Sequence, residues 1–148
     1  MRADRDDHPV SSEFLFVYGT LMRGYPHPMA RELAQRAAYK GKAAYQGRLF
    51  LVESYPGAVP SANKDDVVHG EVFRLNDLAY LTAFDQYEAC DPSASKPTQY
   101  RRVIQTVQMD DGEKVETWIY LYNWPTNKLS RIVSGRFPMP AASSQDLL

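Results

Sequence analysis

Residues 14–24 read FLFVYGTLMRG, a short apolar run that stops at a glycine. The aromatic and branched residues Phe14–Val17 predict a buried strand, after which the chain turns sharply at Gly19. A glycine just past a strand lets successive backbone N–H groups point at one place, where they can bind a carboxylate or an oxyanion. An ordinary turn is the commoner outcome for a short glycine segment, so both interpretations stay open at this point. The candidate anion-binding residues are Tyr18, Gly19, Thr20 and Leu21.

The composition is that of an ordinary globular domain. The chain has 148 residues, of which 44% are hydrophobic and 24% are charged, so one core is expected. No apolar run approaches the roughly 20 residues that a membrane-spanning helix needs. The net charge of −1 shows no excess of lysine and arginine that could bind the phosphates of a nucleic acid. We therefore expect neither a membrane nor a nucleic acid as a partner.

The ends of the chain predict a single domain between two loose segments. Residues 1–12 (MRADRDDHPVSS) are polar and lack the apolar stretch of a secretory signal, which favours a disordered leader and a cytoplasmic protein. The domain is expected to occupy residues 13–137, since the segment beyond Phe137 is rich in proline and serine. We expect residues 138–148 to form a flexible tail.

Cysteine and histidine usage predicts no metal and no cofactor. The single cysteine, Cys90, excludes an internal disulfide, and zinc sites need several cysteine or histidine ligands at set spacings. The three histidines stand in unrelated contexts. Without a neighbouring histidine, Cys90 is better interpreted as a small, partly buried residue than as a nucleophile.

An amphipathic helix is predicted after the turn. Pro28 suits a first helical position, and apolar residues recur at helical spacing until Gly41, which is expected to end the helix. The apolar stripe consists of Ala30, Leu33, Ala34 and Ala37.

Five further strands are predicted from their apolar and alternating patterns. Gly47 is expected to separate the first two, a long loop should cover residues 53–66, and the sequence Asp110-Asp111-Gly112 predicts a tight type I′ hairpin turn between the last two. Residues 89–99 are expected to form a loop. The five strands are Lys40–Gln46, Arg48–Val52, Val67–Leu75, Tyr100–Met109 and Lys114–Tyr122.

A second helix makes Glu88 a candidate general base. Asn76 can cap a helix that starts at Asp77 and runs to about residue 87. If the helix continues, Glu88 lies on the same apolar stripe as Leu81 and Phe84 and faces inward. Burial would raise its pKa toward the range where a glutamate accepts and returns a proton near neutral pH. The alternative is that the helix has ended and Glu88 is a solvated surface residue.

Tyr120 is the remaining candidate for the site. The strand Lys114–Tyr122 alternates between two apolar faces, as expected for a strand that lines a barrel on one side and carries helices on the other. Tyr120 can present its hydroxyl to a pocket or serve only in the core.

Several motifs in order resemble the gamma-glutamylcyclotransferase-like family, including the gamma-glutamylamine cyclotransferases. The resemblance spans residues 14–137 and begins with FVYGTLMRG at residues 16–24. The later landmarks are YPGAV at 55–59, HGEVF at 69–73, FDQYE at 84–88 and YRR at 100–102.

The resemblance implies an α+β fold, a small mixed β-barrel with two or more helices packed outside and a pocket at the barrel mouth. It implies that backbone groups of the turn Tyr18–Leu21 bind a glutamyl head and that Glu88 is the base. The implied reaction is an internal aminolysis, in which the α-amine of a γ-glutamyl group attacks its own γ-carbonyl and releases 5-oxoproline. The substrate would be a γ-glutamyl amine or a γ-glutamyl amino acid, and no cofactor takes part.

Two other classes of function fit the same residues. In the first, the protein binds small amino-acid-like ligands without turnover, and Glu88 only grips an ammonium. In the second, the barrel is a scaffold for protein interactions and its mouth is packed shut. The sequence does not identify the leaving group or the oligomeric state.

Overall fold

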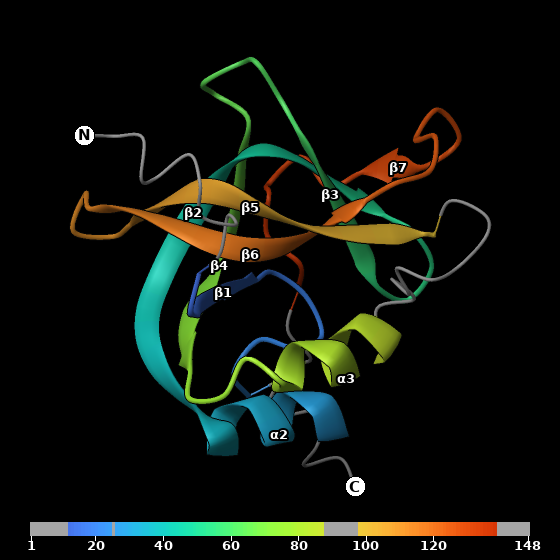
Figure 1. The fold of residues 1–148 in the computed structure, drawn as a ribbon. Helices are drawn as coiled ribbons and strands as arrows, with labels where there is room; N and C mark the ends of the chain where they lie inside the picture. The colour runs from blue at the N-terminus through green and yellow to red at the C-terminus, as the bar shows by residue number, and fades with distance from the viewer. Residues whose placement is uncertain (1–11, 25, 88–97, 139–148) are drawn as a thin grey trace, which may run out of the picture.

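The fold is a closed, mixed β-barrel with two helices at one end (Figure 1). The computed structural model describes residues 12–24, 26–87 and 98–138. Five strands close the barrel in the order β1-β4-β2-β3-β6, and β6 returns to pair with β1. Their bounds are β1 Phe14–Val17, β2 Ala37–Leu51, β3 Pro56–Pro60, β4 Val67–Leu75 and β6 Lys114–Tyr122. The predicted fold class is thereby confirmed.

The barrel is mixed because β6 runs parallel to two of its neighbours. It is parallel to β1 at Leu15–Trp118 and parallel to β3 at Ala58–Leu121, whereas the other pairings are antiparallel. Two strands lie off this ring. Strand β5 (Tyr100–Met109) forms a hairpin with β6 and also meets β2, and β7 (Ser130–Arg131) pairs with the end of β2.

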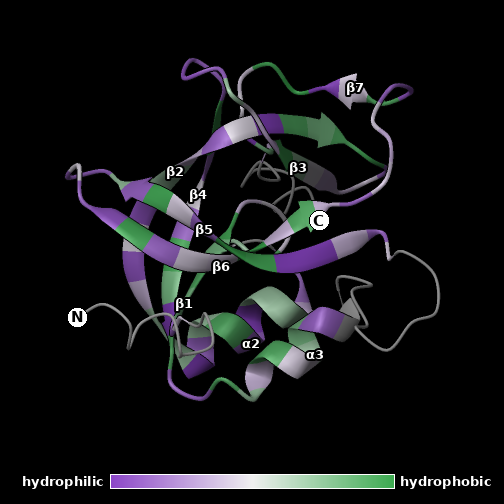
Figure 2. Ribbon diagram, turned by 45° about the horizontal axis from the view of Figure 1, so that its top comes forward, coloured by the Kyte–Doolittle hydropathy of each residue, from purple (hydrophilic) through white to green (hydrophobic). Residues whose placement is uncertain are grey.

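The core fills the barrel and the space between barrel and helices. Hydrophilic and hydrophobic residues alternate along the strands, as Figure 2 shows. The largest fully buried side chains include Phe16 and Phe73 from the barrel and Phe84 from the second helix. Phe137, the last residue of the predicted domain, also belongs to the core.

Helices α2 (Pro28–Arg36) and α3 (Tyr80–Tyr87) lie next to each other at the end of the barrel near β1 (Figures 1 and 2). Arg36 of α2 donates a hydrogen bond to the Tyr80 hydroxyl over 2.7 Å and so links the helices. No helix among the described residues is long and apolar enough to cross a membrane.

Helix α2 is shorter than predicted, and the two strands predicted after it are one. The helix ends at Arg36, and β2 starts at Ala37, which already has extended backbone angles. Gly41, predicted to end the helix, instead has φ 128° at a bulge in β2, where the register against β4 shifts. Gly47, predicted to separate two strands, pairs with Pro60 inside β2. The sequence pattern misleads because a bulge in a strand, or a close contact with a neighbouring strand, favours glycine as much as the end of a helix or strand does.

Helix α3 begins three residues later than predicted. Asp77 forms a turn in which its carbonyl accepts from the Tyr80 N–H over 3.1 Å and its side chain accepts from the Ala79 N–H over 2.9 Å. Asn76, predicted as the cap, instead donates its side-chain amide to the carbonyl of Arg36 over 3.0 Å. This hydrogen bond joins the segment before α3 to the end of α2.

Two further loops differ from their prediction. Residues 56–60, placed in a long loop, form β3, because Pro56–Pro60 pairs with the second half of β2. The β5–β6 hairpin is longer than a type I′ turn. The Met109 N–H donates to Glu113 O over 2.7 Å, the Gly112 N–H donates to Met109 O over 2.8 Å, and Gly112 has φ 93°. This is the three-residue loop with a glycine bulge.

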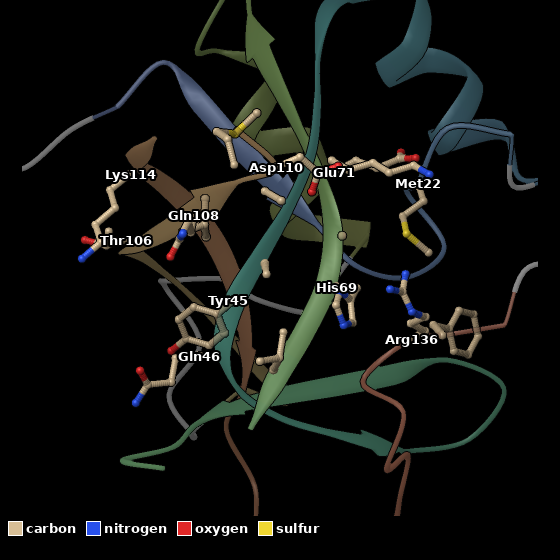
Figure 3. Close-up of a pocket in the computed structure, with 18 of the residues that line it drawn as sticks. Met22, Tyr45, Gln46, His69, Glu71, Thr106, Gln108, Asp110, Lys114 and Arg136 are labelled. Atoms are coloured by element: carbon tan, nitrogen blue, oxygen red, sulfur yellow. The ribbon is translucent and has the colours of Figure 1, made fainter. Parts of the chain in front are cut away.

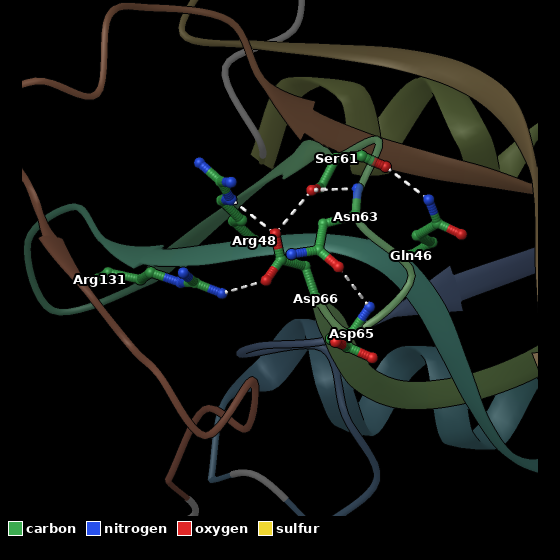
Figure 4. A network of polar contacts seen from close by, with 7 residues as sticks. All are labelled: Gln46, Arg48, Ser61, Asn63, Asp65, Asp66 and Arg131. Atoms are coloured by element: carbon green, nitrogen blue, oxygen red, sulfur yellow. Dashed lines mark hydrogen bonds and ion pairs between the residues drawn. The ribbon is translucent and has the colours of Figure 1, made fainter.

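Asp66 joins the loop after β3 to β2 and to β7 (Figure 4). Its carboxylate accepts from Ser61 Oγ over 2.6 Å, from Arg48 Nε over 2.7 Å and from Arg131 Nη2 over 2.8 Å. The Asp66 carbonyl also accepts from the N–H of Gly47 over 3.0 Å. Asp66 is only 7% exposed. The hydroxyl of Ser61 and the guanidinium groups of Arg48 and Arg131 hold the pKa of Asp66 well below its usual value of 3.8.

We expect Asp66→Asn to lower the thermal midpoint at pH 7 by several degrees, on the order of 5 °C, because two arginines lose their charged partner. A lowered pKa in the folded state stabilises the protein above the usual aspartate pKa, and this stabilisation is lost as pH falls below it. The difference between wild type and variant should therefore shrink as pH falls below about 4. Thermal melts at pH 7, 5 and 3 measure this, and a constant difference would contradict the prediction.

Candidate active site

The turn predicted as an anion cradle lies on one side of a cavity of about 500 Å³. Strand β1 ends at Val17, and the Met22 N–H donates to the carbonyl of Gly19 over 2.9 Å to close the turn. The cavity brings together every substrate-binding candidate, because residues 18–21 and Tyr120 all line it. The complete lining is Phe16, Val17, Tyr18, Gly19, Thr20, Leu21, His27, Ser54, Tyr55, Pro56, Gln99, Tyr100 and Tyr120.

Gly19 is required by a close approach to the opposite wall. A Cβ atom at this position would lie 2.7 Å from Cγ and 2.9 Å from Cδ of Pro56, closer than real side chains come. The turn and the start of β3 therefore touch across the cavity only because residue 19 has no side chain. This is a reason for the glycine that the sequence alone does not reveal.

Tyrosine hydroxyls fasten the walls of the cavity to one another. Tyr18 donates its hydroxyl proton to the carbonyl of Tyr120 over 2.6 Å and accepts from the N–H of Ala58 over 3.1 Å. Tyr100 donates its hydroxyl proton to the carbonyl of Pro56 over 2.6 Å. These contacts join β3, β5 and β6 to the segment after β1. Hydrogen bonds thus join the walls of the cavity to one another.

An ion pair lies behind the Tyr120 side chain. The Tyr120 hydroxyl donates to Asp85 Oδ1 over 2.7 Å. Arg102 donates to the same carboxylate twice, from Nε to Oδ1 over 2.7 Å and from Nη2 to Oδ2 over 3.0 Å. The Arg102 guanidinium also stacks on the Trp118 ring, 4.3 Å from its centroid. Sequence reasoning missed this group, because the pair joins residues 17 positions apart with no pattern between them.

His27 is a second residue of the cavity that sequence reasoning did not identify. It caps helix α2, where its Nδ1 accepts from the N–H of Met29 over 3.1 Å, and Pro28 takes the first helical position. Because Nδ1 acts as an acceptor there, the ring carries its N–H on Nε2. Its place directly before a helix-starting proline was the available signal.

Glu88, the predicted base, lies outside the described residues. Helix α3 is described as far as Tyr87, and the inward orientation of Phe84 and Asp85 on it is plain from their burial, at 2% and 6% exposed. Helix α3 meets the cavity through Asp85, which holds the lining residue Tyr120. Among the described lining residues none is Asp, Glu, Lys or Arg.

A larger hollow of about 1070 Å³ runs along β2, β4 and β5 (Figure 3). Among the described residues it shares none with the smaller cavity, and its Lys42, Lys114 and Arg136 side chains are exposed. Within it, burial lowers the pKa of His69, the charge of Arg136 lowers it further, and Asp110 opposes both. None of the predicted site residues that the structure describes lies there, whereas five of them line the smaller cavity, which is therefore the candidate active site.

An open cavity argues against a barrel whose mouth is packed shut, the arrangement expected of a pure interaction scaffold. In the parts of the chain that the structure describes, no group of three or more His, Cys, Asp or Glu side chains could hold a metal ion.

Known proteins resemble this chain in sequence. A family model described as gamma-glutamyl cyclotransferase, AIG2-like, matches residues 15–139. The gamma-glutamylcyclotransferase family protein YtfP of Escherichia coli K12 is 34% identical over 123 residues, which are 82% of this chain and 92% of that protein. The gamma-glutamylaminecyclotransferase of Mus musculus is 30% identical over 124 residues, which are 72% of this chain and 75% of that protein.

Solved structures agree with the fold. The solution structure of YtfP from Escherichia coli has a TM-score of 0.55 at 32% identity and covers 83% of this chain and 94% of its own. A crystal structure of an AIG2-like protein from Mus musculus has a TM-score of 0.59 at 23% identity, with coverages of 88% and 97%. The latter likeness concerns the fold alone. Because the family model spans most of the sequence, the chain belongs to the gamma-glutamyl cyclotransferase, AIG2-like family.

Proposed function

We propose that this protein is a cyclotransferase that releases 5-oxoproline from a γ-glutamyl amine or a γ-glutamyl amino acid. The observation that supports the proposal most is that the turn of residues 18–21 and Tyr120 line one cavity in a chain of this family. The α-amine nitrogen attacks the γ-carbonyl carbon and forms the ring C–N bond. The bond to the attached amine breaks, and the proton lost by the α-amine is returned to that leaving amine.

The parts of the cavity suit this chemistry. The two reacting groups belong to one molecule, so the protein has to hold a folded conformer, move one proton and stabilise a developing oxyanion. We propose that backbone N–H groups of Gly19, Thr20 and Leu21 face the substrate's anionic or oxyanionic oxygens. A volume of about 500 Å³ is ample for a glutamyl group with a small attached amine.

Glu88 is the proposed general base. It follows helix α3 directly, and the helical period relates position 88 to Phe84 and Asp85, both of which are buried against the barrel. The described lining carries no carboxylate of its own, and we propose that Glu88 supplies one. This assignment also rests on the motif FDQYE at residues 84–88.

The test is incubation of the purified protein with a panel of γ-glutamyl amines and γ-glutamyl amino acids, with 5-oxoproline measured by mass spectrometry. We expect at least one member to yield 5-oxoproline and its free amine in equal amounts. Calorimetry on the same panel separates the alternative function, because a binder without catalysis gives saturable binding and no product. Heat-treated protein controls for spontaneous cyclisation, and equal product with and without folded protein would contradict the proposal.

A further inference from the structure

The hydroxyl protons of three cavity tyrosines are all directed at acceptors of the protein. Tyr18 and Tyr100 donate to backbone carbonyls, and Tyr120 donates to the carboxylate of Asp85. A phenol has a single proton, so a tyrosine oxygen that donates it to one acceptor can meet a second group only as an acceptor. Of the three acceptors, Asp85 is the one that belongs to a side chain and can be exchanged by mutation.

Asp85 is held in place more firmly than a surface carboxylate. It is 6% exposed, it belongs to α3, and both of its oxygens are bound by the planar fork of Arg102. Such a bidentate pair fixes the orientation of the carboxylate as well as its position. The stacking of Arg102 on Trp118 fixes the guanidinium in turn. The direction of the Tyr120 O–H bond therefore depends on Asp85 and, through Asp85, on Arg102.

We propose that Asp85 is a positioning residue that acts through Tyr120. Because its carboxylate accepts the hydrogen bond from the Tyr120 hydroxyl, the phenol oxygen acts as an acceptor at the cavity wall, which selects ligands that place an N–H donor there. The α-ammonium of a glutamyl group is such a donor. The proposal deepens the proposed function and rests on it for the identity of the ligand.

A double-mutant cycle tests the proposal on kcat/KM with the best substrate of the panel. We expect Asp85→Asn and Tyr120→Phe each to lower kcat/KM by about 10- to 100-fold, as supporting residues commonly do. If Asp85 acts through the Tyr120 hydroxyl, the kcat/KM of the double variant is no lower than that of the more impaired single variant. A purely structural role for Asp85 predicts that the two losses multiply, which would overturn the proposal.

Asp66→Asn is the matched control. Asp66 is also a buried aspartate that binds arginine, at 7% exposed, but it lines no part of the cavity. Asp66→Asn should lower stability and leave kcat/KM at the wild-type value. Combined with Tyr120→Phe, it should leave kcat/KM at the value of the Tyr120→Phe single variant. A loss of kcat/KM in this control equal to that of Asp85→Asn would show that the effect comes from weakened packing.

Two further measurements do not depend on turnover. With tyrosines labelled at ¹³Cζ, the Tyr120 signal, assigned by its loss in Tyr120→Phe, should shift in ligand-free Asp85→Asn and stay in place in Asp66→Asn. Calorimetry should show that wild type prefers glutamate to glutarate, which lacks the amine, and that both Asp85→Asn and Tyr120→Phe lose this preference. If both results hold without any product from the panel, the positioning role stands and the proposed reaction falls. An unmoved Tyr120 signal in Asp85→Asn overturns the positioning role, whatever the panel gives.

Discussion

Replacing Glu88 with Gln is expected to lower kcat by at least about 100-fold, the low end of what a positioned general base contributes. Glutamine keeps the size and shape of the side chain and removes its capacity to accept a proton. Ground-state binding should survive in large part. Single-turnover measurements with the best panel substrate separate the two effects, because they report the chemical step apart from substrate binding.

Glu32→Gln is the matched control for this variant. Glu32 lies on the exposed side of helix α2, where it pairs with Arg36, and takes no part in the cavity. Its replacement should leave kcat unchanged. Near-normal turnover in Glu88→Gln would show that the base is assigned to the wrong residue. Loss of binding together with turnover would favour a role in gripping the ligand's ammonium.

Replacing Phe84 with Ala is expected to lower the free energy of unfolding by about 3–5 kcal/mol, the usual loss when a buried phenylalanine is truncated. Phe84 is 2% exposed and belongs to the core cluster through which α3 packs on the barrel. Urea unfolding followed by circular dichroism measures the change.

Leu78→Ala provides the comparison from the same segment. Leu78 lies in the turn before α3 and is 42% exposed, so its truncation should cost less than about 1 kcal/mol. Similar losses in the two variants would show that α3 is not anchored through Phe84. They would also weaken the argument that relates position 88 to the buried face of this helix.

Local patterns predicted the regular parts of the fold. Strands β4, β5 and β6 have the bounds that alternation and turn residues predicted, because each is set by its own hydrophobic period and by the turns beside it. Strand β2 was predicted as two pieces, since its glycines serve a bulge and a close contact that only a folded partner strand creates. The parallel pairings of β6 join distant segments and leave no local mark.

The candidate site likewise combines residues that local sequence patterns predict with residues that only the tertiary fold brings together. The turn at residues 18–21 and Tyr120 were identified because a glycine after a strand and an inward tyrosine are visible in a short window of sequence. Asp85 and Arg102 lie in a helix and a strand whose approach follows from the tertiary fold. A charged residue in a helix looks the same in sequence whether it is solvated or buried against a tyrosine.

Closure of the barrel by its first and sixth strands governs how the protein folds. The hydrogen bond between the Tyr18 hydroxyl and the Tyr120 carbonyl joins residues 102 positions apart, and β1 pairs with β6 over a similar distance. During synthesis the N-terminal strand must wait for nearly the whole barrel before one of its neighbours exists. Topologies dominated by such distant contacts refold on the order of milliseconds to seconds. We therefore expect the cavity to be among the last features to form and one edge of β1 to stay unpaired until β6 is in place.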